Sequence, residues 1–358
     1  MNITVKALNR TALLACAPFL GIMIWLLLSD IVIQLSAEAF PKPITEQTRL
    51  PESDIKHAAA GLDLAQETAS QTRESIQRQL KLYKETNADM AKISSMAASQ
   101  AMRPLQIYDR NITSKLGKVA GTIESDKLRA QLFYIKAENF SAYALKVKLK
   151  SKDAMTMSLG GEELGQAEST LAAVNRHGAV AGINAGGFAD GRGKRYPLST
   201  TIVDGDYVTS FEPPRADLFF VGLNEQNELI GGKFASKQQL DAKNPKFGAS
   251  FVPVLLRGGS PQPIPSKWQT SPKRAPRTVI ANFKDDQLLF LVADGYNESG
   301  SSGATLGEMQ LLLQRYGAVD GYNLDGGGSS SLIFNGRVIN KPSDGQLRKL
   351  PTHFLLFK

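Results

Sequence analysis

The chain has 358 residues, enough for one large domain or two ordinary ones with a sizeable buried core. Its 42 Lys and Arg residues outnumber its 34 Asp and Glu residues, and the net charge is +8. The excess is spread along the chain without a basic stripe interleaved with aromatic residues, which excludes nucleic acid as an expected partner. A modest positive charge suits either an ordinary soluble surface or an anionic substrate.

The first predicted element is a transmembrane signal anchor over residues 11–35. Residues 11–29 contain no charged side chain and are mostly apolar, so the run is long enough to span a bilayer and longer than the apolar region of a usual signal peptide. Lys6 and Arg10 precede it, and positive charge on this flank predicts that residues 1–10 are cytoplasmic. We therefore expect a single-pass membrane protein whose remaining residues are periplasmic or extracellular.

A cleaved signal peptide is the alternative interpretation, because Ala37-Glu38-Ala39 resembles a small-x-small cleavage site. The single cysteine, Cys16, lies in the apolar segment. The outer part of the chain therefore has no disulfide, no thiol nucleophile and no cysteine ligand for zinc. The histidines at 57, 177 and 353 are isolated in sequence, so we do not expect a three-histidine metal site.

Residues 36–52 predict an extended linker, and residues 53–102 predict a long helical stalk. The stalk segment has no proline and one glycine, and is rich in Ala, Gln, Glu, Lys and Leu. Apolar residues at a rough spacing of three to four predict either a weak coiled coil, with self-association through the stalk, or a helix that packs on the next domain. Arg103-Pro104 is expected to end the helix, since the residue before proline disfavours helical geometry.

Residues 105–358 change to a pattern of short strands and turns. This region predicts an α+β domain with mixed or antiparallel sheets, because helices are few. The predicted helices are 164–176 and 305–316. The predicted strands are 132–137, 143–149, 201–203, 218–222, 252–256, 278–282, 288–293, 319–324, 332–334 and 354–357.

An internal echo gives the clearest prediction of a site. Residues 176–187 and 315–326 match at seven of twelve positions, and each copy reads as the end of a helix, a glycine cap, a strand and a polar glycine-rich turn. If the two turns pack side by side, they form one polar pocket. The identical pairs are Arg176/Arg315, Gly178/Gly317, Ala179/Ala318, Val180/Val319, Gly182/Gly321, Asn184/Asn323 and Gly187/Gly326.

The second turn carries a carboxylate beside a potential anion cradle. Asp325 directly follows a predicted strand, and the glycines after it allow a ligand to approach the main chain, whose N–H groups can form a nest for an anion. A flexible Gly/Ser turn is the alternative for this string alone, but its echo favours a site. The candidate binding residues in the two turns are Asn184, Gly186, Gly187, Asn323, Gly326, Gly327, Gly328, Ser329 and Ser330.

Three further residues are candidates on weaker grounds. Arg277 precedes a predicted strand and is suited to bidentate capture of phosphate, although a surface arginine is the default interpretation. Asp294 ends a strand, where a carboxylate is either a turn former or catalytic. Glu308 completes a capping box with Thr305, which explains that pair without any chemistry.

Several motifs in order resemble the phosphodiester glycosidase family over roughly residues 130–358. They are Ile183-Asn-Ala-Gly-Gly-Phe188, Pro276-Arg-Thr278, the strand ending in Asp294-Gly295, the Thr305–Glu308 helix start, Gly317-Ala-Val-Asp320, Asn323-Leu-Asp-Gly-Gly-Gly-Ser-Ser330 and Asn340-Lys-Pro-Ser-Asp-Gly345. Ala185 and Ala189 depart from the family pattern, and Asp190-Gly-Arg-Gly-Lys-Arg195 makes the next loop unusually basic. These departures leave the substrate open.

The resemblance implies hydrolysis of the glycosidic bond of a sugar-1-phosphodiester, in a cell-surface polysaccharide or glycoconjugate. The implied catalytic carboxylates are Asp325 first, Asp294 second and Glu308 third. Arg277 and the Gly326–Gly328 amides would hold phosphate, and the two echoed asparagines would bind sugar or phosphate. The sequence requires no cofactor; carboxylates beside an anion cradle can hold a divalent cation, but no ligand spacing demands one.

Two alternatives belong to other functional classes. One is a catalytically silent envelope protein that binds or assembles glycan with the same pocket. The other is a phosphodiesterase that breaks the P–O bond instead of the C–O bond. Retention or inversion at the sugar carbon depends on the separation of the carboxylates, which the sequence does not give.

Overall fold

A computed structural model describes residues 52–215, 217–295 and 302–358. The chain divides into two compact units, residues 1–92 and 93–358. Among the described residues, no helix is both long and apolar enough to cross a membrane. The predicted anchor over 11–35 and residues 36–51 of the linker predicted over 36–52 lie outside the described residues, and Glu52 is the first residue of a helix.

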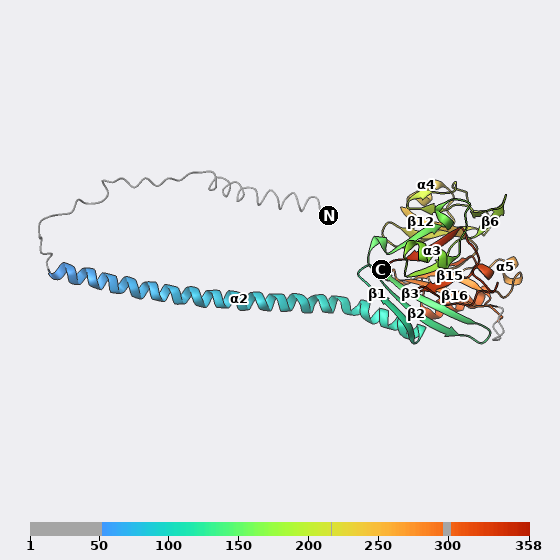
Figure 1. Cartoon of the computed structure of the whole chain (residues 1–358). Coiled ribbons are helices and arrows are strands. Elements are labelled where there is room, and N and C mark those ends of the chain that lie inside the picture. The colour runs from blue at the N-terminus through green and yellow to red at the C-terminus, as the bar shows by residue number, and fades with distance from the viewer. Residues whose placement is uncertain (1–51, 216, 296–301) are drawn as a thin grey trace, which may run out of the picture. The chain divides into compact units, whose positions relative to one another are not determined.

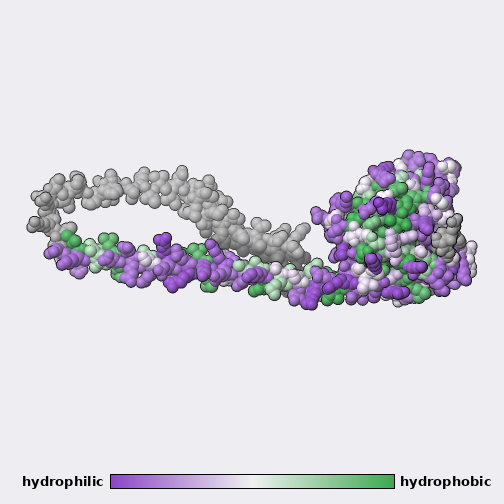
Figure 2. Space-filling view, turned by 60° about the horizontal axis from the view of Figure 1, so that its bottom comes forward, coloured by the Kyte–Doolittle hydropathy of each residue, from purple (hydrophilic) through white to green (hydrophobic). Residues whose placement is uncertain are grey.

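A single helix, α2 (Glu52–Leu116), confirms the predicted helical segment but extends beyond its expected end. Pro104 lies inside this helix and is exposed. A proline removes one backbone hydrogen bond, and at an exposed position water can satisfy the carbonyl that is left. On the face seen in Figure 2, hydrophobic residues are scattered among hydrophilic ones along α2.

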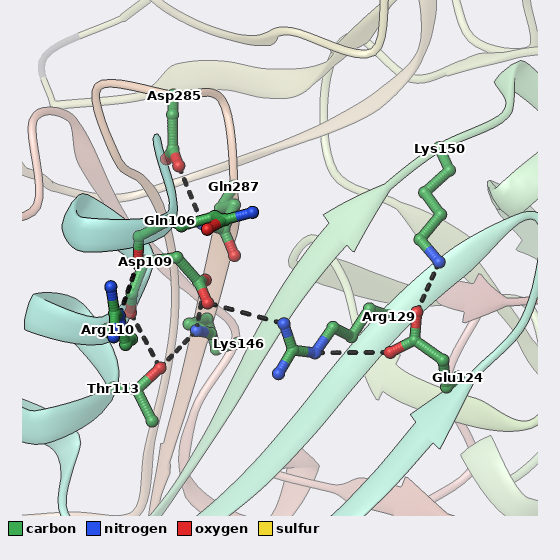
Figure 3. A network of polar contacts seen from close by, with 10 residues as sticks. All are labelled: Gln106, Asp109, Arg110, Thr113, Glu124, Arg129, Lys146, Lys150, Asp285 and Gln287. Atoms are coloured by element: carbon green, nitrogen blue, oxygen red, sulfur yellow. Dashed lines mark hydrogen bonds and ion pairs between the residues drawn. The ribbon is translucent and has the colours of Figure 1, made fainter. Parts of the chain in front are cut away.

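Packing at its C-terminal end explains why α2 continues past Pro104. Ile112 and Leu116 are buried in the second unit. Lys146, also buried, donates to Asp109 Oδ1 over 2.7 Å and to Thr113 Oγ1 over 2.6 Å. Figure 3 shows this contact within a wider polar network that includes Arg129. Tertiary contacts therefore stabilise the last turns against the cost of the proline.

The second unit is built around an 8-stranded sheet with the order β1-β2-β3-β16-β15-β17-β13-β14. All strand pairs among the described residues are antiparallel, which confirms the predicted α+β class with antiparallel sheets and few helices (Figure 1). In chain order its strands are β1 (Val119–Glu124), β2 (Leu128–Lys136), β3 (Ser141–Leu149), β13 (Val254–Arg257), β14 (Ser260–Pro261), β15 (Arg277–Asn282), β16 (Leu288–Ala293) and β17 (Gly321–Leu324).

Two 5-stranded sheets and one hairpin complete the unit. The first sheet contains β8 (Ile202–Val203), β9 (Asp206–Tyr207), β10 (Phe219–Asn224), β11 (Leu229–Gly232) and β12 (Pro245–Phe251). The second contains β4 (Met155–Leu159), β5 (Ala181–Asn184), β18 (Leu332–Phe334), β19 (Arg337–Val338) and β20 (Thr352–Leu356). The hairpin is β6 (Phe188–Gly191) and β7 (Lys194–Pro197).

The helices described after α2 are short. They are α3 (Thr170–His177), α4 (Lys237–Asp241), α5 (Ser266–Thr270) and α6 (Leu306–Tyr316), with 3-10 turns η2 (Lys152–Ala154), η3 (Gly160–Glu162) and η4 (Gly327–Ser329). The predicted helix over 305–316 is confirmed with its capping box at Thr305 and Glu308. The helix predicted over 164–176 begins later, because Ser169 is its N-cap.

Successive side chains of a central strand point to opposite faces of the large sheet, and both sets are apolar, so both faces of the sheet are apolar. Leu288, Phe290 and Val292 of β16 point into the core shared with the other sheets. Leu289 and Leu291 point to the opposite face, which α6 and the end of α2 cover. Phe354 of β20 contacts Phe290 with ring centroids 6.3 Å apart and Phe247 of β12 at 6.0 Å. The three sheets thus share one core, which holds the strand ends that carry the candidate residues.

Candidate functional site

Strand register brings several predicted site residues to one edge of the large sheet. Arg277 pairs with Ala293, and Thr278 pairs with Leu324. Asp294 and Asp325, which follow Ala293 and Leu324, therefore leave the sheet at the edge where β15 begins. A Cβ added to Gly326 would meet the Pro276 carbonyl oxygen at 2.8 Å, so this turn packs directly on the start of β15.

The two echoed units have the same local structure and their turns meet. α3 and α6 both end in a left-handed glycine, Gly178 and Gly317, and each is followed by a strand. The buried Asn184 donates through Nδ2 to the backbone oxygen of Asp325 over 2.6 Å. The N–H of Asp325 in turn donates to the backbone oxygen of Ala185 over 3.3 Å. The convergence of the turns that the echo predicted is therefore present.

Asn184 is fully used in holding the second turn. Its Oδ1 accepts from Thr278 Oγ1 at 2.9 Å and from the Ser331 N–H at 3.0 Å, in addition to the bond that its Nδ2 makes. The echoed Asn323 donates through Nδ2 to the Val252 oxygen over 2.6 Å. Its Oδ1 is buried and has no hydrogen-bond partner among the described residues. The two asparagines are thus alike in position but differ in how far they are satisfied.

Asp325 lies where the two turns meet and has an unusual environment. Its Oδ1 accepts from the Gly326 N–H at 3.0 Å, whereas Oδ2 is buried without a hydrogen-bond partner in the described part of the chain. Burial raises the pKa of Asp325 to about 6, although the Ser329 hydroxyl, the Gly326 N–H and the charges of Arg348 and Arg195 favour the ionised form. A buried carboxylate oxygen without a donor is costly, which is typical of a functional position.

The glycine turn after Asp325 is tightly bonded. The N–H of Gly326 is used by Asp325, and the N–H of Gly327 donates to the Pro276 oxygen over 2.9 Å. Gly327 has a φ of +59°, and a Cβ there would meet no heavy atom within 4 Å. The predicted anion nest therefore has two of its three amides engaged within the protein, while the main chain at Gly327 stays open on its Cβ side.

The serines that follow are buried, and their hydrogen bonds fix the turn to neighbouring segments. Ser330 Oγ lies 3.1 Å from Thr278 Oγ1, whose single proton is donated to Asn184, and the Ser330 carbonyl oxygen accepts from Asn340 Nδ2 at 2.9 Å. Ser331 Oγ lies 2.6 Å from Thr170 Oγ1, which lies 3.1 Å from His353 Nδ1. Burial lowers the pKa of His353 to about 4, so this imidazole is neutral near pH 7 and belongs to the support of the turn.

Two arginines other than the predicted Arg277 lower the pKa of Asp325 through their charge. Arg348 donates through Nη1 to Ser329 Oγ over 3.3 Å and is fixed by Asp344 over 2.7 Å. Arg195 is fixed by Asp190 over 2.7 Å, donates to the Lys349 carbonyl and stacks on the Phe188 ring at 4.1 Å. Both charges lower the pKa of Asp325. Arg348 was not predicted, and Arg195 stood out only as part of a basic loop.

Asp294 is buried and already bonded. Its Oδ2 accepts from the Tyr143 hydroxyl at 2.9 Å, and its Oδ1 accepts from the Lys341 N–H at 2.8 Å. Burial raises the pKa of Asp294, while these two donors oppose the rise. The side chain thus joins β3 and β16 to the segment that also carries Asn340, which is a positioning role beside the turn.

The other two candidates have structural partners. Glu308 completes the capping box and pairs with Arg274 over 2.7 Å; burial raises its pKa, but these donors outweigh burial and leave it below its usual value. Arg277 is buried and donates to the carbonyl oxygens of Ala304 over 3.2 Å and Pro272 over 2.9 Å.

Gly186 and Gly187 have a packing explanation. A Cβ on Gly186 would lie 2.6 Å from Ala249 Cβ, and one on Gly187 would lie 2.6 Å from the Phe251 ring. Both glycines therefore let the first turn approach β12. In the described residues, no group of three or more His, Cys, Asp and Glu side chains is arranged to hold a metal ion.

This arrangement has the parts needed to act on an anionic substrate. One carboxylate has a pKa of about 6 and an oxygen without a hydrogen-bond partner among the described residues, and the charges of two guanidinium groups act on it. The sequence model for phosphodiester glycosidases matches residues 177–357, which include both turns and both arginines. The chain belongs to the phosphodiester glycosidase family. The resemblance predicted over roughly 130–358 is thereby confirmed for the greater part of that range.

Known proteins agree with this assignment. The chain is 31% identical over 137 residues to human N-acetylglucosamine-1-phosphodiester alpha-N-acetylglucosaminidase, which covers 34% of this chain and 26% of the human protein. It is 26% identical over 181 residues to the uncharacterized SPbeta prophage-derived protein YomE of Bacillus subtilis, covering 50% of this chain and 28% of YomE. The matches therefore span less than a third of either relative.

The fold is also shared with a solved structure. The catalytic domain of zebrafish N-acetylglucosamine-1-phosphodiester alpha-N-acetylglucosaminidase superposes with a TM-score of 0.55 at 20% identity, over 67% of this chain and 87% of that domain. At this level of identity the likeness establishes the architecture of the domain.

Proposed function

We propose that this phosphodiester glycosidase hydrolyses the bond between a sugar and the phosphate of a sugar-1-phosphodiester. The observation that carries the proposal is Asp325: its Oδ2 is buried without a donor among the described residues, at the junction of two converging turns. The names of the curated relatives, which specify a phosphodiester substrate, support the same reaction class.

The proposed reaction consumes one water molecule. The bond between sugar C1 and the bridging oxygen breaks, the water oxygen becomes the new hydroxyl on C1, and the released phosphate monoester keeps the bridging oxygen. A phosphate monoester is a stable anion, so this leaving group needs little protonation, unlike the alcohol released in ordinary glycoside hydrolysis. A single carboxylate, acting as nucleophile or as base toward water, is then sufficient.

The roles follow from the surroundings of Asp325. With a pKa of about 6, Asp325 is mostly ionised at pH 7 and can attack C1 or accept a proton from water. Arg348 and Arg195 bind the phosphate, because a guanidinium pairs well with phosphate oxygens and both already act on Asp325. Asn184 positions Asp325 through its backbone oxygen. Asp294 supports the neighbouring segment through Lys341.

The location of the reaction is also a proposal. The uncharged run over residues 11–29, with Lys6 and Arg10 before it, supports a single-pass anchor and a domain that faces the cell envelope. A cell-surface polysaccharide or glycoconjugate is then the substrate within reach. The exposed apolar residues of α2, among them Ile55, Leu62 and Ile76, support self-association through the stalk.

Hydrolysis of synthetic sugar-1-phosphodiesters by the purified full chain in ¹⁸O water tests the reaction. Cleavage of the C–O bond places ¹⁸O in the sugar product, which is the expected result. Label in the phosphate product would instead identify a phosphodiesterase that breaks the P–O bond. Binding of the diester without any turnover would identify a glycan-binding protein. Either of these two results overturns the proposal.

A further inference from the structure

A short hairpin extends directly from the first of the two turns. β6 begins at Phe188, immediately after Gly187, and β7 returns at Pro197, so that the Leu198 N–H donates to the Gly187 oxygen over 2.8 Å. β6 and β7 form a two-stranded sheet of their own, and Figure 1 shows the hairpin standing out beside the larger sheets. At about 3.3 Å per residue, its four-residue strands reach roughly 13 Å from the turn.

The tip of this hairpin carries a charged residue in a backbone conformation that disfavours it. Its two turn residues are Arg192, with a φ of 51°, and Gly193, with a φ of 73°. A left-handed residue in such a turn is usually Gly, Asn or Asp, so arginine is an unfavourable choice there. Its side chain is exposed at the tip of the hairpin.

Three exposed cations lie on the hairpin and on the segment beside it. Arg192, Lys194 and Lys349 are exposed, and in the described residues none of them forms an ion pair. The donation from Arg195 to the Lys349 carbonyl joins the hairpin to this segment. We name Arg192, Lys194 and Lys349 the basic rim.

We propose that the basic rim binds further phosphates of a linear sugar-phosphate polymer while one of its diester bonds lies at Asp325. This inference rests on the proposed function and adds its substrate class. A single diester carries one negative charge, which Arg195 and Arg348 already meet at the site. Additional cations on a projection of roughly 13 Å make no direct contact with such a substrate, whereas a chain with a charge on every repeat can pair with each of them.

The test compares one diester with a chain of the same units. The substrates are a sugar-1-phosphate methyl diester and an oligomer of about ten repeats of that sugar phosphate. The variant is Arg192→Gln with Lys194→Gln in the full chain. The control is Lys148→Gln with Lys243→Gln, which removes the same charge from exposed residues on β3 and before β12. Rates are measured at 50 and 300 mM salt.

We expect the rim variant to lose about tenfold in kcat/KM on the oligomer at low salt, and to stay within about twofold of the parent on the single diester. The loss should shrink at 300 mM salt, because exposed charges are then screened. The control variant should match the parent on both substrates. Equal losses on both substrates, no loss on the oligomer, or the same loss in the control would overturn the inference.

A binding measurement separates this inference from the proposed function. Titration of the oligomer into Asp325→Asn, with and without the rim substitutions, reports recognition without turnover. Weaker binding caused by the rim substitutions supports the rim even if the parent hydrolyses nothing. Oligomer binding that the rim substitutions leave unchanged would contradict the proposed role of the basic rim, even if the parent cleaves the single diester. Equally tight binding of single-stranded DNA of the same charge would contradict it too.

Discussion

Asn184 Nδ2 lies 2.6 Å from the backbone oxygen of Asp325, although 141 positions separate the two residues in the sequence. This bond joins the first glycine turn to the second and fixes the main chain of the candidate catalytic residue. Asn184 is fully buried, so removal of its side chain takes these hydrogen bonds from groups that bulk solvent does not reach. The position of Asp325 therefore depends on a residue in the other copy of the echo.

Replacing Asn184 should destabilise the protein more than replacing its echo, Asn323. Asn184→Ala removes three hydrogen bonds and leaves the backbone oxygen of Asp325 and the N–H of Ser331 without the partner that they have here, whereas Asn323→Ala removes one donor and an oxygen that has no partner among the described residues. We expect losses in the free energy of unfolding of about 3 kcal/mol and about 1 kcal/mol, respectively. Urea titrations measure both, and a larger loss for Asn323→Ala would contradict this account.

Two adjacent glycines should respond differently to alanine. A Cβ on Gly328 would lie 2.1 Å from Asp344 Oδ2 and 2.2 Å from Arg348 Nη2, so Gly328→Ala must displace that pair. We expect on the order of a tenfold loss in kcat/KM, since displacement of a positioning group is costly. Gly327→Ala meets open space and should cost about 1 kcal/mol of stability through its positive φ, with activity nearly kept. Equal activity of the two variants would argue against Arg348 as a phosphate ligand.

The ion pair between buried Lys146 and half-buried Asp109 should stabilise the C-terminal end of α2. Burial pushes the pKa of Asp109 up, but the hydrogen bonds from Lys146 and Gln287 and the charge of Lys146 outweigh it and leave the pKa lowered. Asp109→Ala leaves a buried lysine without its carboxylate and should cost about 3–5 kcal/mol. The double variant Asp109→Leu with Lys146→Met should recover most of this loss in thermal unfolding. A double variant as unstable as Asp109→Ala would refute the pairing.

Asp325 should make stability and activity depend on pH in opposite directions. Its folded-state pKa of about 6 lies above the ordinary value of 3.8, so the folded state binds the proton more tightly. The contribution of this group to stability is therefore full below about pH 4 and is lost as pH rises to about 6, by on the order of 3 kcal/mol. Activity that needs the carboxylate should rise over the pH range around 6. Asp325→Asn, which cannot ionise, should lack this part of the stability profile and be more stable at pH 7.

Local patterns in the sequence predicted the parts of the fold that local chemistry determines. The strands 288–293 and 332–334 and the helix capped by Thr305 and Glu308 were predicted because alternation and capping are read within a few residues. β12 was not predicted, since its interior glycine is needed only where β10 packs against it. Pro104 gave a false helix end because burial of Ile112 and Leu116 overrides it.

The candidate site was predictable where the two echo units carry it. The convergence of the turns follows from the repeated residues, whereas Asp325 aligns with Gly186 in the first copy and was singled out by its place after a strand and by the family resemblance. Arg277 donates to the carbonyl oxygen of Ala304, and Glu308 pairs with Arg274. Both partners lie far away in the sequence, so these contacts could not be predicted from it. Arg348 has no local signal either, since it reaches Ser329 only through the fold of the 341–350 segment.

The turnover of a sugar-1-phosphodiester by Asp325→Asn tests the central claim most directly, with Asp294→Asn as the matched control. We predict that Asp325→Asn remains folded and loses on the order of 10²–10⁴-fold in kcat, the range expected for a catalytic carboxylate, while Asp294→Asn loses mainly stability. Retention of a tenth or more of the parent kcat by folded Asp325→Asn would contradict the account.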